Sequence, residues 1–273
     1  MPINLKKIED DKLIRVLIIG DIVGSSGMPA MHLNLSQLKK QYSCDLIIAN
    51  VENANDGFGI TESLVSELLG LGVQVMTSGN HIWQLPDVVA LFNSSDRILR
   101  PQNYPRGVPG YGVYVENIRK QKVGIINLQG RVSMQSIQCP FEIAEKEIKK
   151  LSKVTSNIII DFHAESLEEK EALAFYLDGK VSAVVGTHTH IQTADERILP
   201  KGTAYITDLG MTGPIDSVIG MKSNVAIKKF LTQLPLKMEV AESAGKISGV
   251  LLTINCLTGN VFSIDRIMKN SIV

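Results

Sequence analysis

Short apolar segments rich in β-branched residues alternate with helical patterns along this chain, and they constrain the fold more than any other feature. Residues 14–19, 158–162 and 181–185 are continuously apolar or nearly so. Strands of this kind are typical of a sheet that helices cover on both faces. Similar segments lie at residues 46–51, 73–77, 123–127 and 204–207. The sequence therefore predicts an α/β fold, and the number of strands is large enough for two sheets.

The boundaries between these segments favour one domain. Helical patterns occupy residues 29–42 and 61–71, and residues 100–112 are so rich in Pro and Gly that they predict a loop. The chain has 273 residues and contains no long linker, repeat or low-complexity segment. We therefore expect a polar extension at residues 1–12, followed by a single domain at residues 13–273.

Charge and cysteine usage exclude several classes of protein. The 28 basic and 28 acidic side chains give no net charge, so the sequence shows no excess of positive charge that would favour binding to duplex nucleic acid or an anionic membrane. The polar start resembles neither a signal peptide nor an anchor, and no apolar segment approaches the ~20 residues of a membrane span. The three cysteines are scattered singly, as in a reducing compartment. These features predict a soluble, cytoplasmic protein.

Polar residues follow five of the apolar strands at the point where each strand ends. In an open α/β sheet the carboxyl ends of parallel strands gather along one edge, where ligands bind. Four of the five histidines lie at these ends, whereas His32 lies in a helical pattern beside leucines. The residues that we expect to share this edge are Asp21, Glu52, Asn53, Asn80, His81, His163, His188 and His190.

All of these residues except His81 form a mixed oxygen and nitrogen donor set of seven side chains without cysteine, which suits Mn, Fe, Zn or Mg. Catalytic zinc sites typically use three protein ligands, so seven are too many for one tetrahedral ion. They divide naturally between two ions about 3.5–4 Å apart that share one carboxylate. Glycines at positions 20, 24, 79 and 186 would let the backbone turn beside such a crowded site.

Each residue alone also has an ordinary explanation. Asp21 could close a turn or cap a helix, Asn80 could cap the segment that follows it, and His163 could be a hydrogen-bonded core residue. His188 and His190 are two apart, so on an extended backbone they would share one face. Independent caps and turns would not place histidines at so many successive strand ends, and the combined pattern predicts a metal site.

Two glycine-containing loops carry weaker signals. Residues 20–27 form a strand-to-helix turn, but their spacing is neither G-x-G-x-x-G nor that of a Walker loop. Residues 208–214 follow another apolar strand and are either a plain turn or a loop on the substrate side of the same edge.

The motifs G-D-x-x-G, E-N-A, G-N-H, an isolated His after a strand, and G-T-H-T-H occur here in this order. Together they resemble the calcineurin-like metallophosphoesterases, and most closely the YmdB-type 2′,3′-cyclic-nucleotide phosphodiesterases. The wider superfamily has D-x-H as its first motif and an aspartate as bridging ligand, whereas here Ile22 and Val23 follow Asp21 and Glu52 stands at the bridge. The YmdB-type subgroup shares both departures, and the resemblance spans nearly the whole chain from Arg15.

The resemblance implies a two-sheet α/β/β/α sandwich with the active site at the carboxyl ends of the strands. It implies two metal ions per chain, associated with iron, with manganese or magnesium as alternatives, and a homo-oligomeric assembly. Carried over to this sequence, Asp21, Asn53 and His190 would bind one ion, Asn80, His163 and His188 would bind the other, and Glu52 would bridge both.

The same resemblance implies hydrolysis of a 2′,3′-cyclic nucleotide at the 2′ bond, which leaves a 3′-phosphate. A hydroxide that bridges the ions would attack phosphorus, and His81 would be the general acid that protonates the leaving oxygen. On an extended strand end, Asn80 and His81 would point to opposite sides, so only one would reach a metal. The alternatives are a broader phosphomonoesterase or nuclease of the same fold, a regulatory or scaffold protein with incidental turnover, and a metal-free binding domain.

Overall fold

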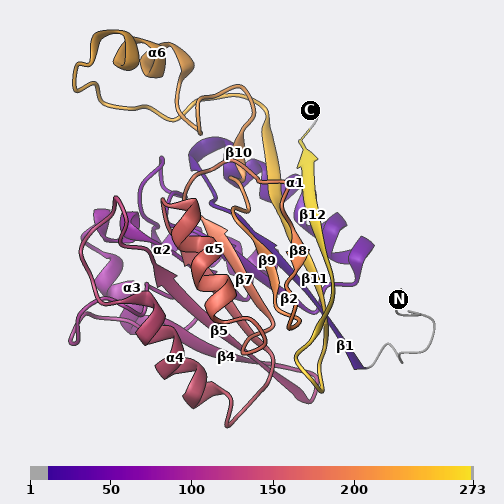
Figure 1. Cartoon of the computed structure of the whole chain (residues 1–273). Coiled ribbons are helices and arrows are strands. Elements are labelled where there is room, and N and C mark those ends of the chain that lie inside the picture. The colour runs from indigo at the N-terminus through magenta and orange to yellow at the C-terminus, as the bar shows by residue number, and fades with distance from the viewer. Residues whose placement is uncertain (1–11, 272–273) are drawn as a thin grey trace.

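Two six-stranded sheets lie face to face at the centre of the molecule (Figure 1). The structure is a computed structural model that describes residues 12–271. Nearly all of the predicted extension at residues 1–12 therefore lies outside the described residues. None of the helices within residues 12–271 has the length and apolar character that a bilayer-spanning helix requires.

The first sheet contains the amino-terminal strands and the carboxyl-terminal hairpin. Its parallel strands are β1 (Leu13–Ile19), β2 (Leu46–Asn50) and β3 (Val75–Thr77). Its antiparallel strands are β11 (Gly245–Asn255), which pairs with β1, and β12 (Val261–Asn270) and the short β10 (Gly213–Pro214), which both pair with β11. The strands β11 and β12 thus form a carboxyl-terminal hairpin, and β12 lies at the edge of this sheet.

The second sheet has a parallel centre and two antiparallel edges. Its order is β4-β5-β6-β7-β9-β8, and the strands β5, β6, β7 and β9 run parallel. The bounds are β4 (Val113–Ile118), β5 (Gln121–Gln129), β6 (Ile158–His163), β7 (Ala183–Thr187), β8 (Arg197–Ile198) and β9 (Ala204–Ile206).

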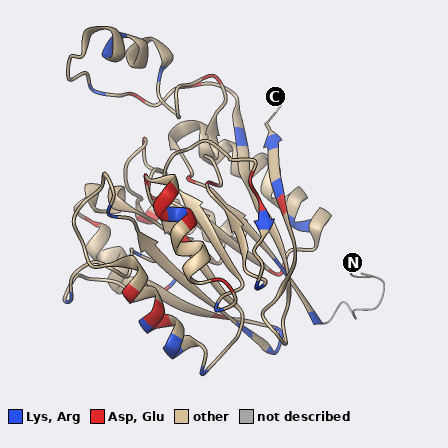
Figure 2. Ribbon diagram, in the orientation of Figure 1, with Lys and Arg blue, Asp and Glu red and all other residues tan. Residues whose placement is uncertain are grey.

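Helices cover the outer face of each sheet, so the molecule has four layers (Figure 1). Charged residues are far more frequent on the helices α4 and α5 than on the strands beneath them (Figure 2). The first sheet carries α1 (Gly24–Tyr42), α2 (Glu62–Leu71) and α3 (Val88–Ser94), and the second carries α4 (Pro140–Leu151) and α5 (Leu167–Tyr176).

The alternation of side chains along β1 explains why the strands are apolar on both faces. Leu17 and Ile19 pack into the core under the helices, whereas Val16 and Ile18 pack into the core between the sheets. Both faces of each sheet are thus shielded from water, as the continuous apolar segments predict.

The site therefore lies between two sheets and not along the edge of one sheet, which corrects one feature of the sequence prediction. The parallel strands of the first sheet deliver Asp21, Glu52 and Asn80, whereas β6 and β7 of the second sheet deliver His163 and His188. Both sets of strands end on the same side of the sandwich, so their polar residues still meet.

The sequence patterns above did not predict a separate arm at residues 215–241. It contains α6 (Ser223–Thr232) and extends away from the sheets (Figure 1). Within α6 only Ala226 is buried, so this helix contributes little to the core.

Candidate metal centre

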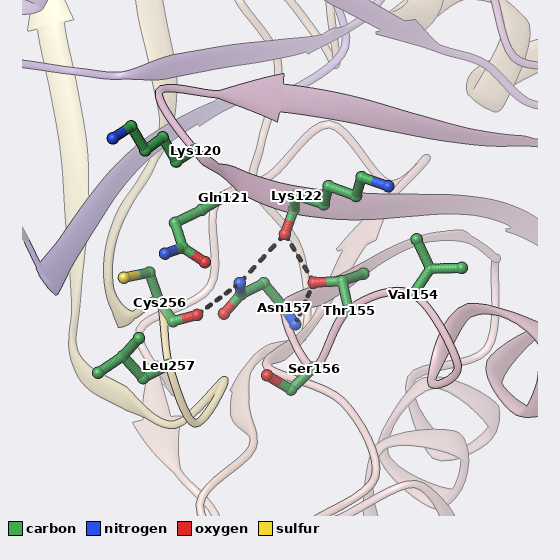
Figure 3. A pocket seen from close by; sticks show the side chains of 9 residues that line it. All are labelled: Lys120, Gln121, Lys122, Val154, Thr155, Ser156, Asn157, Cys256 and Leu257. Atoms are coloured by element: carbon green, nitrogen blue, oxygen red, sulfur yellow. Dashed lines mark hydrogen bonds between the residues drawn. The ribbon is translucent and has the colours of Figure 1, made fainter.

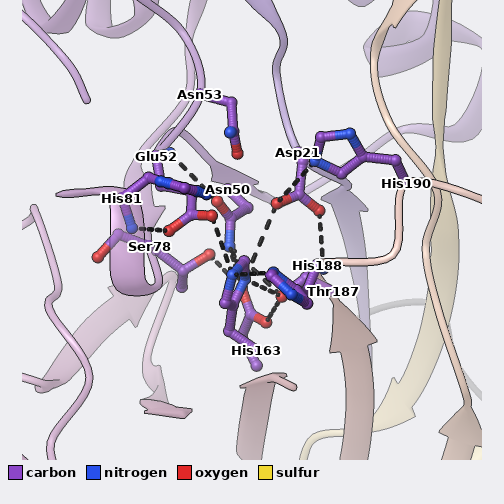
Figure 4. Close-up of polar contacts among 12 residues, drawn as sticks. Asp21, Asn50, Glu52, Asn53, Ser78, His81, His163, Thr187, His188 and His190 are labelled. Atoms are coloured by element: carbon purple, nitrogen blue, oxygen red, sulfur yellow. Dashed lines mark hydrogen bonds and ion pairs between the residues drawn. The ribbon is translucent and has the colours of Figure 1, made fainter. Parts of the chain in front are cut away.

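The polar residues of the strand ends form one cluster between the sheets, and Figure 4 shows most of them. The Glu52 carboxylate and one ring nitrogen each of His163 and His188 lie within 4.8 Å of one another. By strand, the predicted residues are Asp21 after β1, Glu52 and Asn53 after β2, Asn80 and His81 after β3, His163 at the end of β6, and His188 and His190 after β7.

His163 lies at the centre of the cluster. Its Nε2 is 2.9 Å from Glu52 Oε1 and 3.0 Å from His188 Nδ1, and its Nδ1 is 3.8 Å from Asp21 Oδ1. Residue 79 must be glycine beside it, because a Cβ there would lie 2.0 Å from His163 Cδ2. The glycine thus allows close approach of the imidazole, which is a different reason from the turn that the sequence suggested.

Burial sets the charge of the imidazoles. It lowers the pKa of His163 to about 4 and that of His188 to about 4. At neutral pH both rings are therefore uncharged and keep a lone pair, which is the form that binds a metal.

His190 lies on the other side of the cluster. Its Nδ1 is 2.8 Å from the carbonyl oxygen of Ile219, and its Nε2 is 4.0 Å from Asp21 Oδ1. A carbonyl only accepts hydrogen bonds, so Nδ1 carries the proton and Nε2 directs its lone pair toward Asp21. His163 and His190 thus both lie near Asp21, and the division of the residues between two ions stays a prediction.

The carboxylates and amides of the cluster fit a metal because each has one oxygen without a hydrogen-bond partner among the described residues. Burial is the main cause that raises the pKa of the Asp21 carboxyl and of the Glu52 carboxyl, and the nearby imidazoles offset it only in part. Buried polar atoms are normally hydrogen-bonded, and exceptions need an explanation such as an ion. Four predicted ligands have a buried oxygen without a hydrogen bond among the described residues: Asp21 Oδ1, Glu52 Oε1, Asn53 Oδ1 and Asn80 Oδ1.

The His188–His190 turn is not extended, which corrects the reason given for pairing these side chains. His188 has φ 102° and His190 has φ 68°, both in the left-handed region that non-glycine residues rarely adopt. The two rings diverge, one toward Glu52 and one toward Asp21 (Figure 4). Strained backbone of this kind is common at functional sites.

Asn80 and His81 likewise do not end an extended strand, because they begin a 3₁₀ helix, η3 (Asn80–Gln84). The alternation argument for separating their roles is therefore wrong. The His81 backbone N–H donates to Glu52 Oε2 at 2.8 Å, and the His81 ring packs edge-on against Phe58; the separate roles of Asn80 and His81 stay a prediction.

The sequence patterns did not predict a buried hydrogen-bond network that lies behind His163. Asp161 accepts hydrogen bonds from the Thr187 hydroxyl at 2.8 Å and from the Thr77 hydroxyl, and Thr187 Oγ1 lies 3.0 Å from His163 Nδ1. Because the Thr187 hydroxyl gives its proton to Asp161, His163 Nδ1 can donate to it, which leaves Nε2 free for a ligand role. Burial raises the pKa of Asp161 to about 7. The sequence signal for this network was Asp161, a charged residue inside the otherwise apolar start of β6.

A cavity of about 250 Å³ opens beside the cluster. Its size suits a small ligand rather than a macromolecule. Glu165, which the sequence did not single out, lies at this cavity with its Oε2 3.0 Å from His188 Nε2. The cavity is lined by Asn53, Phe58, His81, Glu165, His188, Thr189, His190, Ile219 and Met221.

A second cavity, of about 380 Å³, lies at the opposite end of the strands (Figure 3). Asn157 Nδ2 donates there to the backbone oxygens of Lys122 and Cys256, at 3.1 and 3.0 Å. These bonds tie two turns together, and none of the predicted site residues lies in this cavity.

Comparison with known proteins identifies the family. Residues 17–267 match the family model described as YmdB-like protein. The chain belongs to the YmdB-like family. A relative from Bacillus subtilis, named 2′,3′-cyclic-nucleotide 2′-phosphodiesterase, is 44% identical over 257 residues, which cover 94% of this chain and 97% of the relative.

Solved structures agree with the assignment to the YmdB-like family. A crystal structure described as a novel phosphatase from Mycoplasma pneumoniae has a TM-score of 0.89 and 35% identity, with 94% of each chain covered. A Staphylococcus aureus protein described as a candidate 5′-nucleotidase has a TM-score of 0.63 at 16% identity, covering 96% of this chain and 55% of that one, and shows the shared fold alone. The predicted resemblance and the α/β/β/α metallophosphoesterase sandwich are thus confirmed.

Proposed function

We propose that this chain is a metal-dependent phosphodiesterase that hydrolyses 2′,3′-cyclic nucleotides at the 2′ bond and leaves a 3′-phosphate. The name of the 44% identical Bacillus relative supports the substrate class. The observation that carries the metal dependence is a set of four buried oxygens that find no hydrogen-bond partner within residues 12–271, on Asp21, Glu52, Asn53 and Asn80.

Two ions would be held by the seven predicted ligands, with Glu52 shared between them. Iron is the proposed metal, as the family resemblance implies, with manganese or magnesium as alternatives. The carboxylate, amide and imidazole donors are compatible with iron. When bound, the ions would neutralise the phosphodiester and lower the pKa of the water that attacks phosphorus.

The protein's own residues supply the proton and the shape of the site. The His81 imidazole lines the cavity, and its Nδ1 is buried with no hydrogen-bond partner among the described residues, so we assign the proton transfer to Nε2. Imidazole has a pKa near ambient pH, which suits a general acid for the ribose 2′ oxygen. Phe58 and Met221 give the cavity an apolar side against which a base can pack.

Removal of metal is expected to abolish turnover of 2′,3′-cyclic AMP, and added Mn²⁺ or Fe²⁺ is expected to restore it. The measurement is product formation by chromatography, with the 3′-phosphate as the expected product. Retained turnover after exhaustive chelation would contradict the metal requirement. A 2′-phosphate product, or faster hydrolysis of phosphomonoesters or linear RNA, would favour the broader phosphatase or nuclease.

We also propose a cytoplasmic homo-oligomer in which the arm contacts a second copy. Four large apolar side chains of the arm are 53–80% exposed, and Lys228 and Lys229 lie among them. The start of α5 offers a complementary surface, with the exposed Leu167 beside Glu168. The four apolar residues are Ile227, Phe230, Leu231 and Leu234.

Replacing Phe230 and Leu231 together with serine is expected to convert the assembly to monomers, because burial of these two side chains would stabilise the contact. Sedimentation velocity at micromolar concentration gives the mass. Leu33→Ser, which removes a 57% exposed leucine of α1, is the control and should keep the oligomer. A monomeric wild type, or a double variant of unchanged mass, would refute the proposal.

A further inference from the structure

A fully buried ion pair lies directly behind the metal cluster. Lys170 of α5 and Asp208, which follows β9, are both 0% exposed, and Lys170 Nζ donates to Asp208 Oδ2 at 2.8 Å. Neither residue is one of the proposed ligands or the proposed acid. Burying two charges is costly and often no better than burying apolar residues, so the pair calls for an explanation beyond stability.

Both carboxylate oxygens of Asp208 hold backbone amides of site loops. Oδ2 also accepts the Thr189 N–H at 3.0 Å, and Oδ1 accepts the Gly210 N–H at 2.8 Å. The Gly210 carbonyl packs against Gly20, where an added Cβ would lie 1.8 Å from it, and Gly20 directly precedes Asp21. One carboxylate thus fixes two loops that flank the proposed ligands.

Thr189 is the central residue of the left-handed turn that presents His188 and His190. Positive φ at two non-glycine residues is a conformation that must be held by its surroundings. Two carboxylates hold this turn. Asp21 Oδ2 accepts the His188 N–H at 3.2 Å, and Asp208 Oδ2 accepts the Thr189 N–H. Asp21 is itself a proposed metal ligand, so of these two carboxylates Asp208 is the one that anchors the turn without also serving an ion.

We propose that Lys170 and Asp208 are positioning residues that hold the His188–His190 turn in its ligand-binding form before metal binds. This inference rests on the proposed metal centre. Lys170 balances the charge of Asp208 so that the carboxylate can stay buried next to the acidic cluster, and Asp208 holds the backbone of Thr189 between the two imidazoles. Residues that orient metal ligands typically change metal affinity by about 10–100-fold when they are replaced.

The test is direct titration of metal-free protein with Mn²⁺ by calorimetry, without substrate. The double variant Lys170→Met with Asp208→Asn removes both charges, so it avoids an unpaired buried ion. Its amide has one accepting oxygen and cannot hold both the Thr189 and the Gly210 N–H. We expect its dissociation constants for Mn²⁺ to rise about 10–100-fold, while KM for 2′,3′-cyclic AMP at saturating Mn²⁺ changes little.

A matched control is Lys180→Met, which removes an exposed ion pair with Glu145 at 2.9 Å and should leave Mn²⁺ affinity unchanged. Lys170→Met alone leaves Asp208 without its cation, and it should weaken Mn²⁺ binding even if the double variant folds poorly. Wild-type affinity in either Lys170 variant overturns the positioning role but leaves the proposed function intact. Failure of the wild type to bind Mn²⁺ overturns the metal centre and the positioning role together.

Discussion

His81→Ala is expected to lower kcat on 2′,3′-cyclic AMP by about 10²–10⁴-fold, the usual contribution of a general acid. The His81 ring makes none of the contacts that join the imidazoles of His163 and His188 to Glu52, so the variant should keep both ions. Metal content by elemental analysis and steady-state rates on the same preparation measure the two effects.

The loss should depend on the leaving group. A ribose oxygen must be protonated as it departs, whereas p-nitrophenolate barely needs a proton. We therefore expect His81→Ala to lose much less activity on bis-p-nitrophenyl phosphate than on the cyclic nucleotide. An equal loss on both substrates would contradict the acid role.

His188→Ala is the companion variant and should behave differently. His188 Nδ1 lies 3.0 Å from His163 Nε2 within the cluster, so its loss should lower metal content and activity together on every substrate. If His81→Ala also loses metal, then His81 is a ligand and the proposed assignment of roles is wrong.

Glu52→Ala is expected to empty both metal positions and to reduce turnover by at least about 10³-fold, since the lost charge stabilisation amounts to several kcal/mol. Glu52 is fully buried; its Oε1 lies 2.9 Å from His163 Nε2 and its Oε2 accepts the His81 N–H. The variant therefore loses the proposed bridge and the anchor of the proposed acid at once. Elemental analysis after reconstitution with Mn²⁺ is the measurement.

A buried acid elsewhere provides the control for Glu52. Glu147 of α4 is 5% exposed and is held by Lys150 at 2.7 Å, far in the sequence from the strand ends. Glu147→Gln should keep about two ions per chain and nearly full activity. Glu52→Ala that still binds two ions would show that another carboxylate is shared.

The sequence alone determined the fold class and the residues of the candidate site. A strand covered on both faces is largely apolar, so polar residues gather at its carboxyl end or just after it. That signal is local, and it located Asp21, Glu52 and His163 before any contact was known. The same local motifs, in order, were enough to identify the family.

Tertiary structure alone decided how these residues meet and what holds them. The pairing of Lys170 with Asp208 joins positions 38 apart, and that of Asn50 with Asp161 joins positions 111 apart, so no local pattern encodes either. Distant carboxylates also hold two local conformations. The left-handed turn begins at His188, whose N–H donates to Asp21, and the 3₁₀ helix begins at Asn80, whose neighbour His81 donates its N–H to Glu52. Burial of a charge is stable only with a partner, and the partner is chosen by packing between sheets rather than by neighbours in the chain.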